Sequence, residues 1–289
     1  MSKPKILIQL DTDPHPSTFD AVVAVDAGAE RLLQYGGVTP DNVEGLVHGA
    51  MFTRGPGDLH QTAIFVGGSN VEAGERLLAR VKKCFFGPMR VSVLLDANGA
   101  NTTAAAAVLA AAKHLHLKEA TATVLAGTGP VGQRAARLLA GKGAKVRVAS
   151  RTQAKAEAVC AAIRARQPSA EVTAAQIASP DETAAALAGA SLVISAGAAG
   201  VELLPESVRT QAKELRVAID LNAVPPVGIG GVQPQDKAVE RDGVVCYGAL
   251  GVGGTKMKIH RAAIERLFQK NDLVLDAEEV LALGEELAR

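Results

Sequence analysis

The sequence predicts two α/β domains, each built on a mostly parallel sheet, with a cleft between them. Apolar runs of strand length alternate with helical stretches over the first 117 residues, and the alternation resumes from residue 118. The length of 289 residues suits two domains of ordinary size. We place the first domain at 1–117, joined by C-terminal helices at 269–289, and the second at 118–268.

In the first domain, three short apolar runs are the expected strands: 5–10, 62–66 and 90–95. Ser17 or Thr18 is expected to cap a helix that starts near Phe19 and runs towards Leu33. Pro40 suits the first position of a second helix. Further helices are expected over residues 69–86 and through the alanine-rich run that starts at residue 102.

In the second domain, the expected strands are 122–126, 144–150, 191–196, 216–221 and 244–247. Helical patterns follow the first strand and recur at 153–165, 181–187, 255–268 and 276–287, with Asp276 as an N-cap. The glycine-rich stretch 248–254 is interpreted as a loop. Ligands of open α/β sheets bind beyond the carboxyl ends of the strands, so the loops at those ends are candidate binding segments.

The stretch VLAGTGPVG carries the strongest functional motif, a Gly-x-Gly-x-x-Gly between a strand and a helix. In this motif Gly127 makes the tight turn, Gly129 lets a pyrophosphate approach the backbone, and Gly132 lets helix and strand pack closely. The helix N-terminus then offers N–H groups to the phosphates. We therefore predict a Rossmann-type NAD(P) site that includes Thr128, Pro130 and Val131. The alternative interpretation is an ordinary strand–helix turn.

The end of the next strand bears on the choice of nucleotide. NAD sites usually carry an acidic residue there to bind the ribose hydroxyls, but this strand ends in Ser150, Arg151 and Thr152, and Lys155 follows. A guanidinium beside hydroxyls suits a 2′-phosphate, so NADP is predicted, with NAD as a possible second cofactor. Alternatively, these charges are simply solvated. Ala196 and Gly197, at the end of the strand 191–196, and Asn222, just after the strand 216–221, complete the predicted nucleotide site.

Composition excludes several classes of function. The 31 basic and 30 acidic residues leave a formal charge of +1, and aromatic residues are scarce, which argues against a nucleic-acid partner. Cys84, Cys160 and Cys246 lack metal-ligand spacing and are expected to be buried or free thiols. No apolar segment suggests a signal peptide or a membrane span. We expect a cytoplasmic protein that binds neither a metal nor a membrane.

Seven blocks of the sequence resemble the bacterial NAD(P)-dependent methylene-tetrahydromethanopterin dehydrogenases, which are related in fold to methylene-tetrahydrofolate dehydrogenases. They are FDAVVAVDAGAERLLQYGGVTPDNV, TAIFVGG, KKCFFGPMRVS, LDANGANTTAAA, VLAGTGPVG, DLNAVPPVGIGG and GALGVGGTKMKIHRA. The resemblance covers essentially the whole chain. It implies hydride transfer between a pterin and NAD(P) in the one-carbon metabolism of methylotrophs, and a homo-oligomer, either a trimer or a trimer-based hexamer.

The resemblance also implies which residues lie at the pterin. The family's Phe, Thr, Lys and His match Phe19, Thr103, Lys256 and His260, which we take as the catalytic group. Asp20 is a candidate for binding pterin amino groups, and Asn101 and Thr102 are further substrate-binding candidates. Without the resemblance, a core Phe, solvated lysines and an ordinary His are the simpler interpretations. The first loop departs from the family in reading DPHPS, which puts pterin selectivity in doubt.

Two other functions remain open. A methylene-tetrahydrofolate dehydrogenase with cyclohydrolase activity usually carries Tyr-x-x-x-Lys on a helix of the first domain, but neither Tyr35 nor Tyr247 has a Lys four residues later. A non-catalytic NADPH-binding sensor would need the nucleotide half of the chain without the pterin residues.

Overall fold

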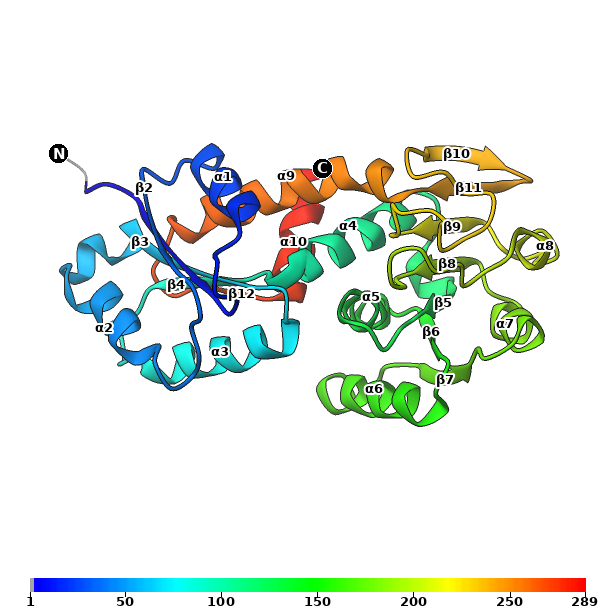
Figure 1. Ribbon diagram of the computed structural model, residues 1–289, viewed down its shortest axis with the longest axis horizontal. Coiled ribbons are helices and arrows are strands. Elements are labelled where there is room, and N and C mark those ends of the chain that lie inside the picture. Colours follow the sequence, from blue (N-terminus) through cyan, green and yellow to red (C-terminus); the bar gives the residue numbers. More distant parts are fainter. Residues whose placement is uncertain (1–2) are drawn as a thin grey trace. The chain divides into compact units, whose positions relative to one another are not determined.

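The computed structural model describes residues 3–289 and forms two compact units (Figure 1). Unit 1 runs to Thr102 and includes Met257–Arg289, whereas unit 2 is Thr103–Lys256. Both divisions fall inside helices, α4 (Ala100–Ala112) and α9 (Ala249–Leu267). The boundaries expected from the sequence, after residues 117 and 268, lie just beyond the ends of the same two helices.

Unit 1 contains a five-stranded parallel sheet in the order β12-β4-β3-β1-β2. Its strands are β1 (Ile6–Asp11), β2 (Arg31–Tyr35), β3 (Thr62–Gly67), β4 (Ser92–Leu95) and β12 (Val274–Leu275). Its helices, besides parts of α4 and α9, are α1 (Thr18–Asp26), α2 (Glu44–Phe52), α3 (Val71–Cys84) and α10 (Ala277–Leu287). Because the strands are parallel, the loops that follow β1, β3 and β4 share one edge of the sheet.

Three expectations for unit 1 are wrong. The first helix ends at Asp26 instead of continuing to Leu33, because Gly28 takes a positive φ of 84° and the chain turns back as β2. Strand β2 then pairs with β1, a long-range contact that local sequence does not report. Pro40 does not begin a helix either, since it lies in a turn and α2 starts at Glu44. The two-residue strand β12 was not anticipated.

Two helix caps expected from the sequence are confirmed. Ser17 is the N-cap of α1, and its hydroxyl accepts a hydrogen bond from the Asp20 N–H. Asp276 is the N-cap of α10 in a capping box with Glu279. Both caps hold the first turn of a helix at a defined place on the sheet.

Unit 2 contains a seven-stranded sheet in the order β10-β11-β9-β8-β5-β6-β7, in which only β10 is antiparallel. Its strands are β5 (Thr121–Leu125), β6 (Lys145–Ser150), β7 (Val172–Gln176), β8 (Leu192–Ser195), β9 (Val217–Asp220), β10 (Lys237–Arg241) and β11 (Val244–Tyr247). Its own helices are α5 (Pro130–Gly141), α6 (Gln153–Arg166), α7 (Pro180–Leu187) and α8 (Glu206–Arg209). The chain reverses its winding direction between β5 and β8, as in the doubly wound Rossmann sheet. The predicted fold class of two α/β units is confirmed, although β7 and β10 were missed.

Residues 249–254 of the stretch 248–254 are helical, so its interpretation as a loop is wrong. Helix α9 begins at Ala249, and Gly248 donates its N–H to the Asp236 carbonyl at 2.9 Å. A Cβ atom on Gly248 would lie 2.0 Å from the Gln233 carbonyl oxygen, and one on Gly251 would lie 1.8 Å from the Asp236 carbonyl oxygen. These two glycines therefore let the start of α9 pack directly against the backbone before β10.

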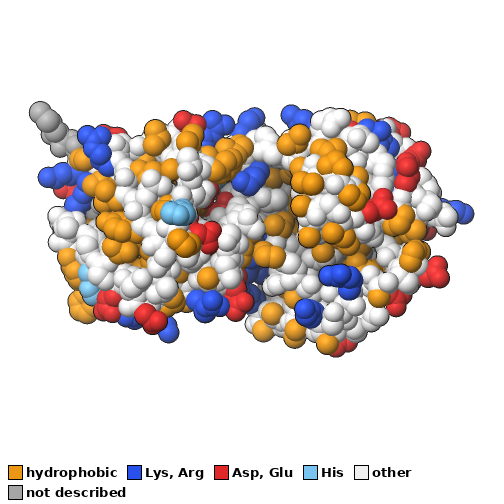
Figure 2. Space-filling view, viewed as in Figure 1, with side chains coloured by type: hydrophobic (Ala, Val, Ile, Leu, Met, Phe, Trp, Pro, Cys, Tyr) orange, Lys and Arg blue, Asp and Glu red, His pale blue; other side chains and the backbone are white. Residues whose placement is uncertain are grey.

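The three thiols are free and buried, as expected. Burial raises the pKa of the Cys246 thiol to about 11, so it is protonated at neutral pH. Among residues 3–289, no helix is both long enough and apolar enough to cross a membrane. On the face drawn in Figure 2, basic and acidic side chains are interspersed over each unit.

Candidate active site

The glycine-rich turn of unit 2 lies between β5 and α5, at the carboxyl edge of the sheet. A Cβ on Gly127 would lie 2.9 Å from Val148 Cγ1, and one on Gly132 would lie 2.6 Å from the Ala126 carbonyl oxygen, so packing alone requires glycine at both positions. A Cβ on Gly129 would meet nothing closer than 3.4 Å. The fold itself does not demand glycine at 129, and a glycine there fits a ligand that approaches the backbone.

The turn is linked to the end of β6 through hydroxyl groups. The Thr128 and Ser150 hydroxyl oxygens are 3.4 Å apart, and the Ser150 hydroxyl also accepts a hydrogen bond from the Thr152 N–H. Arg151 and Lys155 are exposed, and neither forms an ion pair with another described residue. Two cationic groups therefore lie beside the turn and remain open to an anionic ligand. This donor set fits the phosphates of NADP.

Polar side chains at the loop after β9 form hydrogen bonds to the backbone of that loop. The Asn222 amide donates to the Pro226 carbonyl and accepts from the Val224 N–H, and the residue is 4% exposed. Burial raises the pKa of the Asp220 carboxyl, although hydrogen bonds from the N–H groups of Asn222 and Ile229 oppose the shift. Asn222, predicted to bind the nucleotide, thus has its side chain occupied in shaping its own loop. After β8, Ala196 and Gly197 are half-buried.

In unit 1, three aromatic rings from three elements form a row. The ring of Phe65, on β3, is stacked on that of His260, on α9, with centroids 5.7 Å apart and planes at 23°. The Phe19 ring, in the first turn of α1, lies 6.4 Å from the imidazole at 33°. Asp20 Oδ1 is 3.9 Å from His260 Nε2. The structure therefore brings three predicted site residues together.

Asn101 and Thr102 are placed differently from what the sequence suggested. They are 1% and 0% exposed, and their polar groups are used within unit 1. The Asp96 carboxylate accepts hydrogen bonds from both backbone N–H groups and from the Thr102 hydroxyl at 2.6 Å. The Asn101 amide donates to the Leu95 carbonyl and to Asp276. Instead of pointing to solvent, these side chains anchor the start of α4.

Thr103 and Lys256 are the residues at the two limits of unit 2, and both are half-buried. Lys256 is on α9, one turn before His260 and on the same helix face. Phe65 and Asp96, which contact His260 and Thr102, were not among the residues predicted for the site. Phe65 lies in a fully buried strand, where nothing local distinguishes it from a core residue, whereas the Asp after an apolar run in LDANGAN was an available signal for Asp96.

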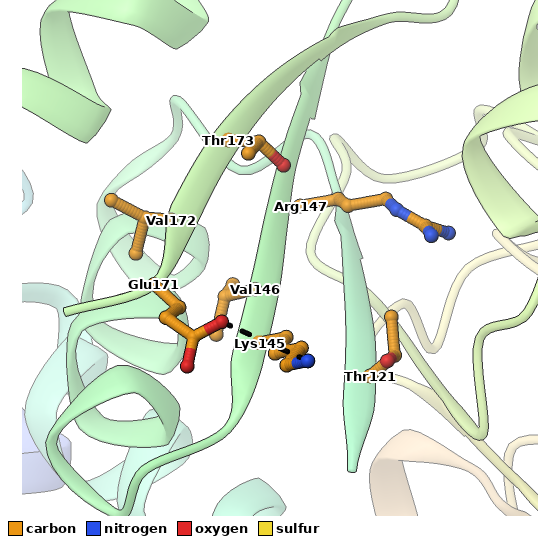
Figure 3. A pocket seen from close by; sticks show the side chains of 7 residues that line it. All are labelled: Thr121, Lys145, Val146, Arg147, Glu171, Val172 and Thr173. Atoms are coloured by element: carbon orange, nitrogen blue, oxygen red, sulfur yellow. Dashed lines mark ion pairs between the residues drawn. The ribbon is translucent and has the colours of Figure 1, made fainter.

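A hollow of about 390 Å³ occurs elsewhere in unit 2 (Figure 3). It is lined by Thr121, Lys145, Val146, Arg147, Glu171, Val172 and Thr173. Thr121, Lys145 and Val172 are the first residues of β5, β6 and β7, so the hollow lies at the amino edge of the sheet. Nucleotides bind at the opposite edge of such sheets. No group of three or more His, Cys, Asp or Glu side chains within residues 3–289 is arranged to hold a metal ion.

The Rossmann sheet with its glycine turn, together with a second α/β unit, defines a two-unit protein of the Rossmann nucleotide-binding class. Two solved structures share this fold at low sequence identity. Shikimate 5-dehydrogenase from Listeria monocytogenes, in complex with shikimate and NAD, is 15% identical with a TM-score of 0.56, covering 98% of this chain and 96% of that chain. Quinate dehydrogenase from Corynebacterium glutamicum, in complex with NAD, is 14% identical with a TM-score of 0.53 and 99% of both chains covered.

Comparison with protein families identifies the particular group. Residues 18–98 match the N-terminal domain of methylene-tetrahydromethanopterin dehydrogenase, and residues 108–231 match shikimate/quinate 5-dehydrogenase. Two Methylorubrum extorquens proteins are similar over the whole length: "Bifunctional protein MdtA", 49% identical with 100% of both chains covered, and "NAD(P)-dependent methylenetetrahydromethanopterin dehydrogenase", 32% identical with 98% of both covered. The chain belongs to the methylene-tetrahydromethanopterin dehydrogenase family, and the resemblance noted from its sequence is confirmed.

Proposed function

We propose that this oxidoreductase transfers hydride reversibly from 5,10-methylene-tetrahydromethanopterin to NADP, giving the methenyl form, in the oxidation of formaldehyde-derived carbon. The observation that carries the proposal is the match, over 98% of both chains, to a relative named for this pterin and for NAD(P). The intact glycine turn supports it, because Gly129 leaves room that no side chain of the fold occupies. A location in the cytoplasm belongs to the same proposal.

The chemistry explains why the protein has no need of a catalytic base. Loss of hydride from a CH2 group between two nitrogens leaves a cation that both nitrogens stabilise, so no proton has to be removed. The bound nicotinamide supplies the hydride acceptor. The residues of the chain then have to align the pterin and exclude water. We assign Phe19 to stacking on the pterin, Asp20 to its amino groups, and Thr103 and Lys256 to its orientation.

Initial-rate assays provide the test. Purified protein mixed with methylene-tetrahydromethanopterin and NADP is expected to raise the NADPH absorbance band. Parallel assays with NAD and with methylene-tetrahydrofolate measure the preference for nucleotide and the preference for pterin. Absence of turnover with either pterin, together with tight NADPH binding, would instead support a non-catalytic sensor.

A second candidate activity is oxidation of methylene-tetrahydrofolate, and two observations bear on it. The relative at 49% identity is named a bifunctional protein, although its name does not say which two activities it has. The departure in the first loop, where His15 lies between Pro14 and Pro16, also leaves room for a different pterin preference. If turnover with methylene-tetrahydrofolate exceeds that with the methanopterin, this second activity is the principal one.

We expect Arg151→Ala to raise the KM for NADP about tenfold or more, because a charge-assisted hydrogen bond contributes about 1.5–3 kcal/mol. The KM for NAD, which lacks the 2′-phosphate, is expected to change little. Lys145→Ala is the matched control, since Lys145 is also an exposed cation on β6 but lies at the other end of the strand. Equal effects of Arg151→Ala on both nucleotides would remove Arg151 from the 2′-phosphate site.

We also propose that the protein forms a homo-oligomer, either a trimer or a trimer-based hexamer. Exposed apolar side chains on two contacting elements of unit 1 support self-association: Val22 and Val25 of α1 are 55% and 59% exposed, and Leu33 of the edge strand β2 is 43% exposed. Val25→Glu is expected to shift the mass measured by light scattering towards the monomer. Val201→Glu, at an exposed valine of unit 2, is the control. An unchanged mass for Val25→Glu would exclude this surface from the interface.

A further inference from the structure

The ring row in unit 1 changes from fully buried to exposed along its length. Phe65 is 1% exposed and His260 is 0% exposed, while Phe19, the last ring, is 53% exposed. The imidazole is therefore enclosed, and the solvent-exposed end of the row is the Phe19 ring. The residue predicted to act directly on substrate, His260, lies behind the residue predicted to stack on it.

The backbone at Phe19 is also anchored to the sheet by hydrogen bonds. The Asp11 carboxylate, which is fully buried at the end of β1, accepts a hydrogen bond from the Ser17 N–H at 3.0 Å. Ser17 in turn caps α1 by accepting from the Asp20 N–H. The backbone of the first turn of α1 is thus fixed to the sheet. What remains to be oriented is the Phe19 side chain, whose ring lies beside that of His260.

An exposed phenylalanine in a first helical turn ordinarily exchanges between rotamers. Ring–ring contact favours particular separations and orientations, and a buried ring that cannot move imposes them on its neighbour. Here Phe65 is held within the central part of the sheet, because β3 pairs with both β1 and β4. His260 is stacked on this fixed ring and is in turn the ring neighbour of Phe19.

We propose that His260 is a positioning residue whose planar ring, backed by Phe65, holds the Phe19 ring at a fixed orientation as the stacking face for the pterin. The inference rests on the proposed function, in which Phe19 contacts the substrate. It assigns His260 a role through its shape and not through proton transfer. It also adds Phe65, which touches neither ligand, to the residues that determine how the pterin binds.

Two substitutions of His260 separate ring shape from hydrogen bonding. His260→Phe keeps a planar ring and removes the nitrogens, whereas His260→Asn keeps polar atoms and removes the ring. We expect His260→Asn to raise the KM for the pterin about 2- to 10-fold, which is the change in affinity expected from losing one aromatic pair. The KM for NADP is expected to stay unchanged. His260→Phe is expected to restore most of the loss. If His260→Asn behaves like the wild type while His260→Phe fails, the role of the ring is refuted.

Phe65→Leu tests the core end of the row, with Phe52→Leu, at a 56% exposed phenylalanine on α2, as the matched control. Phe65→Leu is expected to raise the KM for the pterin and not that for NADP. A general loss of folded protein would lower the apparent kcat and would leave the KM for the pterin and the KM for NADP unchanged. A Phe65→Leu enzyme that folds and retains the wild-type pterin KM would overturn the proposal.

A spectroscopic readout distinguishes failure of this inference from failure of the proposed function. The chain has no tryptophan, so Phe19→Trp introduces a single indole. Adding Phe65→Leu or His260→Asn to that variant is expected to lower the indole's fluorescence anisotropy, and unchanged anisotropy would overturn the inference. Addition of tetrahydromethanopterin is expected to change the emission of Phe19→Trp. If the pterin leaves the emission unchanged while the second substitution still lowers the anisotropy, the ordering of residue 19 by the ring row is supported and its role in pterin binding is rejected.

Discussion

Gly129→Ala is expected to weaken NADP binding about 10- to 100-fold while leaving the protein folded. The added Cβ would lie 3.4 Å from the nearest atom, the Ala126 carbonyl oxygen, which is an ordinary contact, and the φ of −76° suits alanine. The methyl group would nevertheless occupy the space through which a pyrophosphate reaches the backbone. Each hydrogen bond lost to a charged phosphate costs about 1.5–3 kcal/mol. Calorimetric titration with NADP and a thermal melt measure the two effects separately.

Gly132→Ala is the matched control and is expected to behave in the opposite way. Its Cβ would lie 2.6 Å from the Ala126 carbonyl oxygen and 2.8 Å from Gly127 Cα, both of them backbone atoms. Overpacking of this kind costs about 1–3 kcal/mol, so the melting temperature should fall by roughly 2–10 °C. Wild-type NADP affinity in Gly129→Ala would show that the nucleotide does not bind at this turn.

Lys256→Met is expected to lower turnover about 100-fold, the cost of a substrate misplaced by about an ångström, with NADP affinity nearly intact. Lys256 is half-buried on α9. A lysine near the reacting carbon would oppose the developing cation, so its expected contribution is to orient the pterin and not to stabilise charge. Methionine keeps most of the length of the side chain and removes its ammonium group. Stopped-flow or steady-state NADPH formation measures the change.

Lys258→Met is the control for this prediction. Lys258 is on the same helix two residues later, so it projects to a different side, and it is exposed. Its replacement is expected to leave turnover within about twofold, as for a typical surface substitution. Unchanged turnover in Lys256→Met would exclude that residue from the site.

The features predictable from sequence were those set by local pattern and by chemical type. The order strand, glycine turn, helix at 122–139 follows from an apolar run, three spaced glycines and helical periodicity, and the structure shows each element there. Ser150, Arg151 and Thr152 were found from residue type and spacing. The cap of α1 at Ser17 depends on a hydroxyl and the backbone three residues on, so it too could be read locally.

The errors occurred where long-range contacts override local preference. Residues 31–33 continue a helical pattern, but pairing with β1 makes them a strand. The glycines at 248 and 251 suggest a flexible loop, whereas close backbone contacts with Gln233 and Asp236 place them at the start of a helix. In both places the deciding atoms lie more than ten residues away in the sequence.

By itself, the sequence determined the α/β class, the family, the glycine turn and the residue types available to bind a nucleotide and a pterin, because these depend on spacing and chemical identity. Only the tertiary structure decided which side chains are accessible. It buried Asn101 and Thr102 against Asp96, and it buried His260 beside the rings of Phe65 and Phe19. Burial and ring contact arise between segments that meet only on folding, so no local pattern encodes them.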